Sequence, residues 1–194
     1  MFILAISGSL RAGASNTALL RAAALLSPSN ITVELYKGID ALPHFNPDLD
    51  TGDPSTLPSE VAEFRASVGR ADAVLLSTPE YAHGLPGSFK NALDWLVGST
   101  EFPGKPVAIV SPTSRSTYAQ AQLREILTTM SARIIEPASV VVALPNRRMT
   151  VEAIVADHAL ASSIRSVLLN LLESLGRAPS SPAADRRIDG SAFP

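Results

Sequence analysis

The chain has 194 residues, of which 46% are hydrophobic and 18% charged, and its net charge is −2. This length favours one domain with a sizeable core, and the small net charge offers no electrostatic attraction for nucleic acid or an anionic membrane. The sequence contains no cysteine, which excludes disulfides, thiolate nucleophiles and cysteine-ligated metals or clusters.

Short apolar runs alternate with helical patterns along the chain. The runs that predict strands are Phe2–Ser7, Ile31–Tyr36, Ala73–Ser77, Pro106–Ser111 and Ala138–Leu144. The segments with apolar residues at helical spacing are Asn16–Leu26, Ser59–Arg70, Ser88–Val97, Ala119–Ser131 and Val151–Leu175. This alternation predicts an α/β fold, a three-layer sandwich in which helices cover both faces of a five-stranded parallel sheet.

Five such strands favour the flavodoxin-like order 2-1-3-4-5. In this order the ligand site lies at the switch point between strands one and three, outside the carboxyl ends of the strands. The two most unusual loops of the chain follow those two strands, which supports the order.

Two stretches carry no regular pattern. Asp40–Pro58 is rich in Pro, Asp, Gly and Ser and is longer than a simple turn, as functional or interfacial loops often are. Residues 177–194 are rich in Pro, Ser, Ala and Arg with little apolar content, which indicates a mobile C-terminal tail. We therefore expect one domain over residues 1–176, followed by this tail.

The loop after the first strand concentrates hydroxyl groups and an arginine before a helix. A helix N-terminus holds phosphate through its free N–H groups and positive dipole end. Side chains that would add donors or charge are Ser9, Arg11, Ser15, Asn16 and Thr17, while Gly8 and Gly13 allow close backbone approach. The alternative is a plain helix cap at Ser15 or Asn16.

The loop does not match either of two common nucleotide-binding motifs. Ala14 stands where a Walker A loop needs lysine, which makes an NTPase a poor interpretation. Leu10 stands at the second glycine of the dinucleotide fingerprint. A terminal monophosphate fits the loop better.

The loop after the third strand continues through Pro79, Glu80, Tyr81, Ala82, His83 and Gly84. It offers an aromatic ring, an acid and an imidazole but little proton chemistry, which suits holding a flat cofactor. Tyr81 is better placed to contact a ring than to fill a core, and Glu80 is a cofactor contact or simply a loop acid.

With both loops described, the chain resembles the NADPH-dependent FMN reductase family, flavodoxin-like flavoproteins that include quinone, azo and chromate reductases. The resemblance covers roughly residues 1–175. The segments that carry it are Gly8-Ser9-Leu10-Arg11 with Ser15-Asn16, Pro79-Glu80-Tyr81 with Pro86-Gly87 and Lys90–Trp95, and Leu42-Pro43 with Phe45-Asn46 and Asp48-Leu49.

This resemblance implies FMN as cofactor and NADPH or NADH as electron donor, with electrons passing to a small-molecule acceptor such as a quinone, flavin, azo compound or metal oxyanion. It places the FMN phosphate on Ser9, Arg11, Ser15, Asn16 and Thr17, and the isoalloxazine ring against Pro79, Glu80 and Tyr81. Backbone N–H groups of the loop through Ala82, His83 and Gly84 would face the polar edge of the ring. No catalytic side chain is assigned, because the flavin carries the chemistry.

The resemblance also implies a homodimer or homotetramer, with the loop after strand two and the helix after the flavin loop near the subunit contact. The chain departs from the family at two places. The family usually has Asn where His83 stands, and Ser111–Tyr118 replaces a glycine pair after strand four. In that segment Ser111 and Arg115 are possible cofactor ligands.

Other residues carry weaker signals. His44, His83 and His158 show no metal-ligand spacing, so we expect no metal site, and no Gly-x-Ser-x-Gly elbow supports a serine hydrolase. Trp95 is interpreted as a core or interface aromatic, and Arg147-Arg148 as a solvated pair, with a cofactor-phosphate role as the alternative.

No segment reaches the roughly 18 unbroken apolar residues that a membrane helix needs. Met1–Ile6 is too short for a signal peptide and has no basic flank, so we expect a cytoplasmic protein without membrane insertion. Two rival functions remain open: a flavodoxin-type electron carrier, and a non-catalytic flavodoxin-like binding module.

Overall fold

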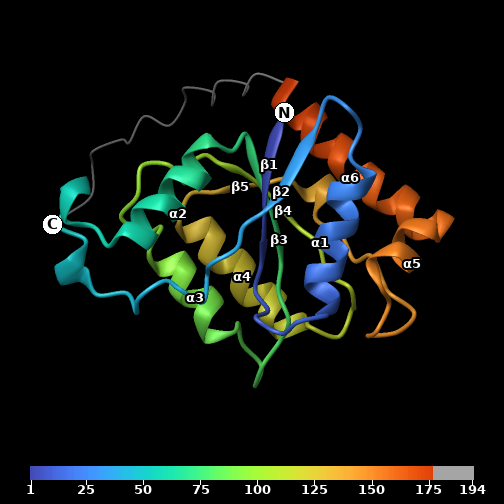
Figure 1. Cartoon of the computed structure of the whole chain (residues 1–194), viewed down its shortest axis with the longest axis horizontal. Helices are drawn as coiled ribbons and strands as arrows, with labels where there is room; N and C mark the ends of the chain where they lie inside the picture. Colours follow the sequence, from blue (N-terminus) through green and yellow to red (C-terminus); the bar gives the residue numbers. More distant parts are fainter. Residues whose placement is uncertain (177–194) are drawn as a thin grey trace, which may run out of the picture.

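Five strands form a parallel sheet in the order β2-β1-β3-β4-β5 (Figure 1). The computed structural model describes residues 1–176, so the predicted tail at 177–194 lies outside the described residues. The strands are β1 (Phe2–Ser7), β2 (Thr32–Leu35), β3 (Ala73–Ser77), β4 (Pro106–Ile109) and β5 (Arg133–Ile134). The predicted flavodoxin-like order is confirmed, with β1 and β3 as neighbours at the switch point.

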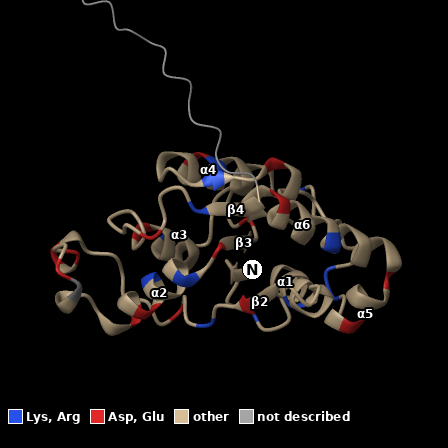
Figure 2. Cartoon of the chain, turned by 90° about the horizontal axis from the view of Figure 1, so that it is seen from above, with Lys and Arg blue, Asp and Glu red and all other residues tan. Residues whose placement is uncertain are grey.

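Helices cover both faces of this sheet. One face carries α1 (Ser15–Leu26), α5 (Val151–Ala156) and α6 (His158–Gly176), and the other carries α2 (Ser59–Arg70), α3 (Gly87–Asp94) and α4 (Thr117–Thr129) (Figure 2). The predicted three-layer sandwich is confirmed.

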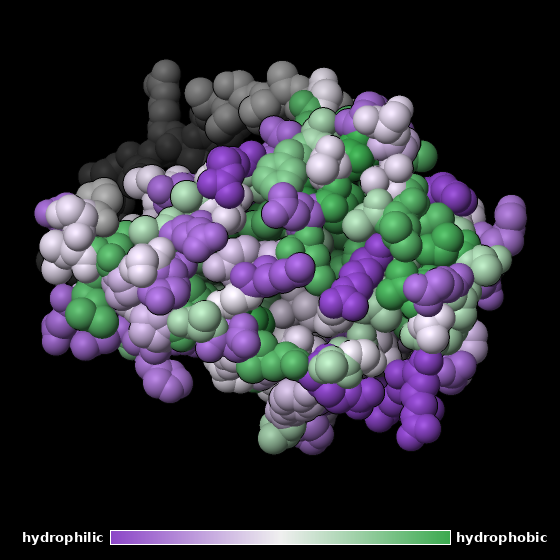
Figure 3. Space-filling model, in the orientation of Figure 1, coloured by the Kyte–Doolittle hydropathy of each residue, from purple (hydrophilic) through white to green (hydrophobic). Residues whose placement is uncertain are grey.

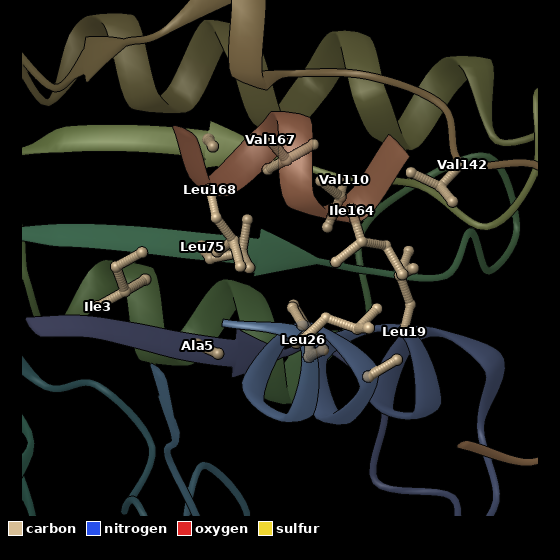
Figure 4. Packing of buried hydrophobic residues seen from close by; sticks show 14 of the residues in the cluster. Ile3, Ala5, Leu19, Leu26, Leu75, Val110, Val142, Ile164, Val167 and Leu168 are labelled. Carbon is tan, nitrogen blue, oxygen red and sulfur yellow. The ribbon is translucent and has the colours of Figure 1, made fainter. Parts of the chain in front are cut away.

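Alternate residues of the central strand pack into two hydrophobic cores, one on each face of the sheet, because successive side chains of a strand point to opposite faces. In β3, Leu75 packs among residues of α1 and α6, including Leu19 and Leu168 (Figure 4). Its neighbours Val74 and Leu76 belong to the second core with Phe64 of α2 and Leu123 of α4 (the wider cluster also holds Trp95). The sequence of a strand that is buried on both faces is therefore a continuous run of apolar residues.

The fifth strand lies earlier than the predicted Ala138–Leu144, and that prediction is wrong. β5 pairs with β4 only at Arg133–Ile134, and a 3-10 turn, η3 (Glu136–Ala138), follows. Beyond the turn only an isolated bridge joins Ser111 to Val141, with Leu144 N donating to Pro112 O at 3.0 Å. Proline lacks an N–H group, so Pro112 cannot continue the ladder that a strand needs.

The predicted helix Val151–Leu175 is two helices, α5 and α6, and the single helix is wrong. Asp157 ends the first with extended backbone, at φ −76° and ψ 113°. Its Oδ1 then accepts hydrogen bonds from the N–H groups of Ala159 and Leu160, both at 3.0 Å. Aspartate is a strong N-cap, so this residue stops one helix and starts the next.

The long loop after β2 lies against α2 and α3 through polar contacts that include a nearly buried ion pair and an indole hydrogen bond. Asp50 forms a bidentate, nearly buried ion pair with Arg65, at 2.7 and 3.0 Å. Trp95 is fully buried, as predicted for a core aromatic, and its indole N–H donates to Pro43 O at 2.7 Å. The loop includes two short 3-10 turns, η1 (Pro47–Leu49) and η2 (Pro54–Thr56).

Within residues 1–176, no helix has the length and apolar character to cross a membrane. The same residues contain no group of three or more His, Cys, Asp or Glu side chains placed to hold a metal ion.

Candidate active site

Four loops enclose one cavity of about 480 Å³ at the carboxyl ends of the strands. They follow β1, β3 and β4 and precede α5, and in Figure 1 they gather at the lower edge of the sheet. This is the position that the switch point predicts. The lining residues are Ser9, Arg11, Ala14, Ser15, Asn16, Pro79, Glu80, Tyr81, Pro112, Thr113, Ser114, Arg115, Ser116, Ala143, Leu144, Pro145, Asn146 and Arg147.

The N-terminus of α1 opens into this cavity without a cap of its own. Its N-cap residue is Ala14, no side chain caps the first turn, and that turn contains no acidic residue. The alternative of a plain cap by Ser15 or Asn16 is therefore wrong. Free N–H groups at the positive end of a helix form a site for an anion such as phosphate.

The predicted phosphate residues divide into two groups. Ser9, Arg11 and Ser15 line the cavity with partly or fully exposed side chains. Asn16 also borders the cavity but is buried, and its Nδ2 donates to Ser77 Oγ at 3.0 Å. Thr17 is outside the lining, with its hydroxyl 2.7 Å from that of Ser7. Gly13 turns the loop at φ +71°, where glycine is unstrained.

The loop after β3 makes a tight hairpin turn. Tyr81 and Gly84 exchange backbone hydrogen bonds of 3.0 and 2.9 Å, and Ala82 and His83 between them have φ of 48° and 60°. Two successive left-handed residues are typical of a type I′ turn. The turn leaves the Tyr81 side chain 55% exposed at the cavity, whereas Ala82, His83 and Gly84 lie outside its lining.

Helix α4 holds this hairpin through three contacts. Glu80 Oε2 accepts a hydrogen bond of 2.9 Å from the N–H of Ala119, in the first turn of α4. Gln122 Oε1 accepts one of 2.8 Å from the N–H of Leu85. The His83 ring stacks on Tyr118, with 4.2 Å between centroids. Because the N-cap of α4 makes no side-chain bond of its own, Glu80 acts as its cap from another loop.

The loop after β4 forms the third side of the cavity. Arg115 lines it, as the sequence allowed. Ser111 is buried outside the lining, and its hydroxyl donates to Thr113 O at 2.7 Å. The segment Pro112–Ser116 therefore forms this wall of the cavity.

The fourth side of the cavity is Ala143–Arg147, of which the sequence singled out Arg147 alone, with a cofactor-phosphate role as the alternative to a solvated residue. Ser15 Oγ donates to Arg147 O at 3.0 Å, which joins this segment to the phosphate loop. The pair Arg147-Arg148 was the only signal in the sequence for it, and a pair of exposed arginines is more often solvated.

The charge of the cavity is positive. Arg11, Arg115 and Arg147 line it against a single acid, Glu80, whose carboxylate already accepts a bond from Ala119. In the described part of the chain, none of these three arginines forms an ion pair. A free helix N-terminus, three guanidinium groups and an exposed tyrosine beside Pro79 fit a phosphate joined to a flat aromatic ring.

A sequence model of the family described as NADPH-dependent FMN reductase matches residues 1–146. An NAD(P)H-dependent FMN reductase of Pseudomonas aeruginosa is 38% identical over 130 residues, which cover 64% of this chain and 68% of the relative. A probable NADPH:quinone oxidoreductase of Oryza sativa subsp. japonica is 32% identical over 193 residues, which cover 93% and 92%.

Solved structures have the same fold. The flavoenzyme NAD(P)H:(acceptor) oxidoreductase of Paracoccus denitrificans superposes with a TM-score of 0.69 at 27% identity, covering 90% of this chain and 97% of the other. An archaeal flavodoxin superposes with a TM-score of 0.58 at 12% identity, covering 91% of this chain and all (100%) of the other, which shows the fold alone.

Proposed function

The chain belongs to the NADPH-dependent FMN reductase family and is an FMN-dependent oxidoreductase. From this premise we propose that the cavity between its four loops holds FMN. We also propose that a quinone is its electron acceptor. One observation supports the site above all. A single cavity of about 480 Å³ joins the uncapped N-terminus of α1 to the exposed Tyr81. The two ends match the two chemically different ends of FMN.

At the phosphate end, the backbone N–H groups of the first turn of α1 would donate to the anion, and Ser9 would add a hydroxyl donor. Ser15 would contribute its backbone N–H, because its hydroxyl proton is already donated to Arg147 O. Arg11 supplies a charge-assisted bond. Asn16 and Thr17 act through their backbone and through inward bonds to Ser77 and Ser7, which hold the loop against the sheet.

At the ring end, Pro79 and Tyr81 offer an apolar and an aromatic surface. Ala82, His83 and Gly84 contribute the turn that directs Tyr81, and Glu80 fixes that turn on α4. FMN bound there would supply the two-electron chemistry that links NAD(P)H to the acceptor, and the protein would supply orientation, electrostatics and access. No side chain of the cavity is required as an acid or a base.

A quinone as acceptor is favoured by the relatives and by the mouth of the site. Relatives named quinone reductase or NADPH:quinone oxidoreductase occur in bacteria and in rice. The exposed ring of Tyr81 (55%), which lines the cavity, offers a flat apolar surface to a planar acceptor.

The test begins with purified protein loaded with FMN, desalted, and given NADPH without oxygen. We expect a retained flavin spectrum that bleaches and then recovers when benzoquinone is added. NADH, free FMN, an azo dye and chromate, tried in parallel, rank donors and acceptors. Flavin that is retained but does not bleach would favour an electron carrier, and protein that retains no flavin would contradict the proposed site.

We also propose a homodimer or homotetramer working in the cytoplasm, where NAD(P)H is available. Leu49 (40% exposed) and Val97 (64% exposed) lie in the loop after β2 and just after α3, the two regions in which the family resemblance places the subunit contact. Sedimentation equilibrium of the wild type and of a Val97→Asp variant tests this. A wild type that sediments as a monomer would refute it.

A further inference from the structure

The segment Ala143–Arg147 lies at the end of the residues that match the family model. The family match ends at residue 146, yet the next residue lines the cavity. In Figure 3, which keeps the view of Figure 1, hydrophilic side chains gather at the lower right, where the loop before α5 lies. This loop is therefore a wall of the cavity that lies at the end of the family match.

Hydrogen bonds on both sides hold the loop in place. At its start, the N–H of Val142 donates to Ser111 O at 2.9 Å, and the N–H of Leu144 donates to Pro112 O at 3.0 Å. After it, Thr150 caps α5 through a bond of 3.2 Å from the N–H of Ala153. Between these points Ser15 Oγ reaches Arg147 O. The backbone of residue 147 is thus fixed beside the first residue of α1.

This placement gathers positive charge at one point. The N-terminus of α1 has no cap and no acidic residue in its first turn, and Arg11 and Arg147 border the same cavity from two different loops. Neither arginine forms an ion pair with any residue between 1 and 176. Two unpaired guanidinium groups beside a free helix N-terminus favour a ligand with more than one negative charge, which would offset the repulsion between these like charges.

We propose that Arg147 is a second arginine ligand of the FMN phosphate, which it binds opposite Arg11. The inference rests on the proposed function, since it assumes that the phosphate lies at the start of α1. A dianionic phosphate accepts charge-assisted bonds from both guanidinium groups, while Ser15 holds the loop that carries the second one. Arg148 is exposed and outside the cavity lining, so it serves as the matched control.

The experiment measures the affinity of apoprotein for FMN and for riboflavin by flavin fluorescence quenching, in wild type, Arg147→Ala and Arg148→Ala. Riboflavin is the same ring and chain without the phosphate. We expect Arg147→Ala to weaken FMN binding about tenfold or more, as loss of a bond to a charged group predicts. Riboflavin affinity should stay at the wild-type value, and Arg148→Ala should bind both flavins as wild type does.

Three outcomes would overturn the inference. Equal loss of FMN and riboflavin affinity would mean that Arg147 supports the fold of the site. Unchanged FMN affinity with a raised KM for NADPH but not for NADH would assign Arg147 to the nucleotide's extra phosphate. An equal loss of FMN affinity in Arg148→Ala would mean that both arginines act through the general positive charge of this surface and not through a direct bond. Failure of wild type itself to bind FMN would instead refute the proposed function.

Discussion

A Cβ atom on Gly8 would clash with Oγ1 of Thr78 and lie 2.8 Å from its Cβ. The backbone of the phosphate loop therefore packs against the side chain of Thr78 at the start of the flavin-ring loop, and the N–H of Gly8 donates to Ser77 O at 2.8 Å. Glycine at position 8 lets the phosphate loop and the flavin-ring loop lie in contact, because any Cβ there would push β1 and β3 apart where their loops begin.

Gly8→Ala is expected to lower the free energy of unfolding by about 1–3 kcal/mol through overpacking, and to weaken FMN binding as the loops separate. Urea unfolding and flavin titration measure the two effects. Gly87→Ala is the control, because Gly87 opens α3 with no atom within 4 Å of its Cβ position. A Gly8→Ala protein as stable as wild type would contradict the close approach.

Glu80→Ala is expected to cost about 1 kcal/mol of stability, because it removes the cap on the N–H of Ala119. It should also weaken flavin binding by freeing the hairpin from α4. Glu80→Gln keeps a carbonyl oxygen at the same position and should restore most of both quantities. If Glu80→Gln behaves like Glu80→Ala, the carboxylate charge matters and the cap does not.

Arg65→Ala is expected to destabilise the protein by about 3–5 kcal/mol, because it leaves the carboxylate of Asp50 nearly buried without its partner. The double variant Asp50→Ala with Arg65→Ala should be less destabilised than the sum of the two single variants. Thermal unfolding of all four proteins gives the coupling. Additive effects would show that the pair contributes nothing to holding the loop after β2.

His83→Val is expected to cost about 1–3 kcal/mol, because residue 83 has a φ of 60° and a β-branched side chain is strained there. It also removes the ring that stacks on Tyr118. His83→Asn should fold normally, because asparagine tolerates the left-handed region. Denaturation midpoints of the two variants separate the backbone effect from the loss of stacking, and equal midpoints would exclude the strain.

Glu152→Gln is expected to lower stability near neutral pH by an amount that disappears in acid. A hydrogen bond from its own backbone N–H and another from the Thr150 hydroxyl hold the pKa of Glu152 below its ordinary value. A carboxyl with a lowered folded-state pKa stabilises the protein above its unfolded-state pKa, and this contribution is lost as the pH falls through the folded-state value. Unfolding of both proteins across that range checks the sign. A difference independent of pH would contradict it.

The strands β1 and β3 and the helix α2 begin and end where the sequence predicts. The two strands are short, continuous apolar runs, and α2 has apolar residues at helical spacing after Pro58, so local pattern is sufficient. The fifth strand is different. Its apolar run at Ala138–Leu144 has strand character, but pairing depends on a partner N–H that Pro112 lacks, and this partner is distant in the sequence.

The site, like the fold, was predicted from the sequence only in part. Sequence alone determined which loops carry it, because Ser9, Arg11, Pro79 and Tyr81 follow adjacent strands whose carboxyl ends meet in a parallel sheet. Only the tertiary structure decided the rest. The carboxylate of Glu80 is bound to α4, and Arg147 reaches the cavity because Ser15, 132 positions away, holds its backbone. Contacts between residues so far apart arise from packing of whole elements, which no local pattern encodes.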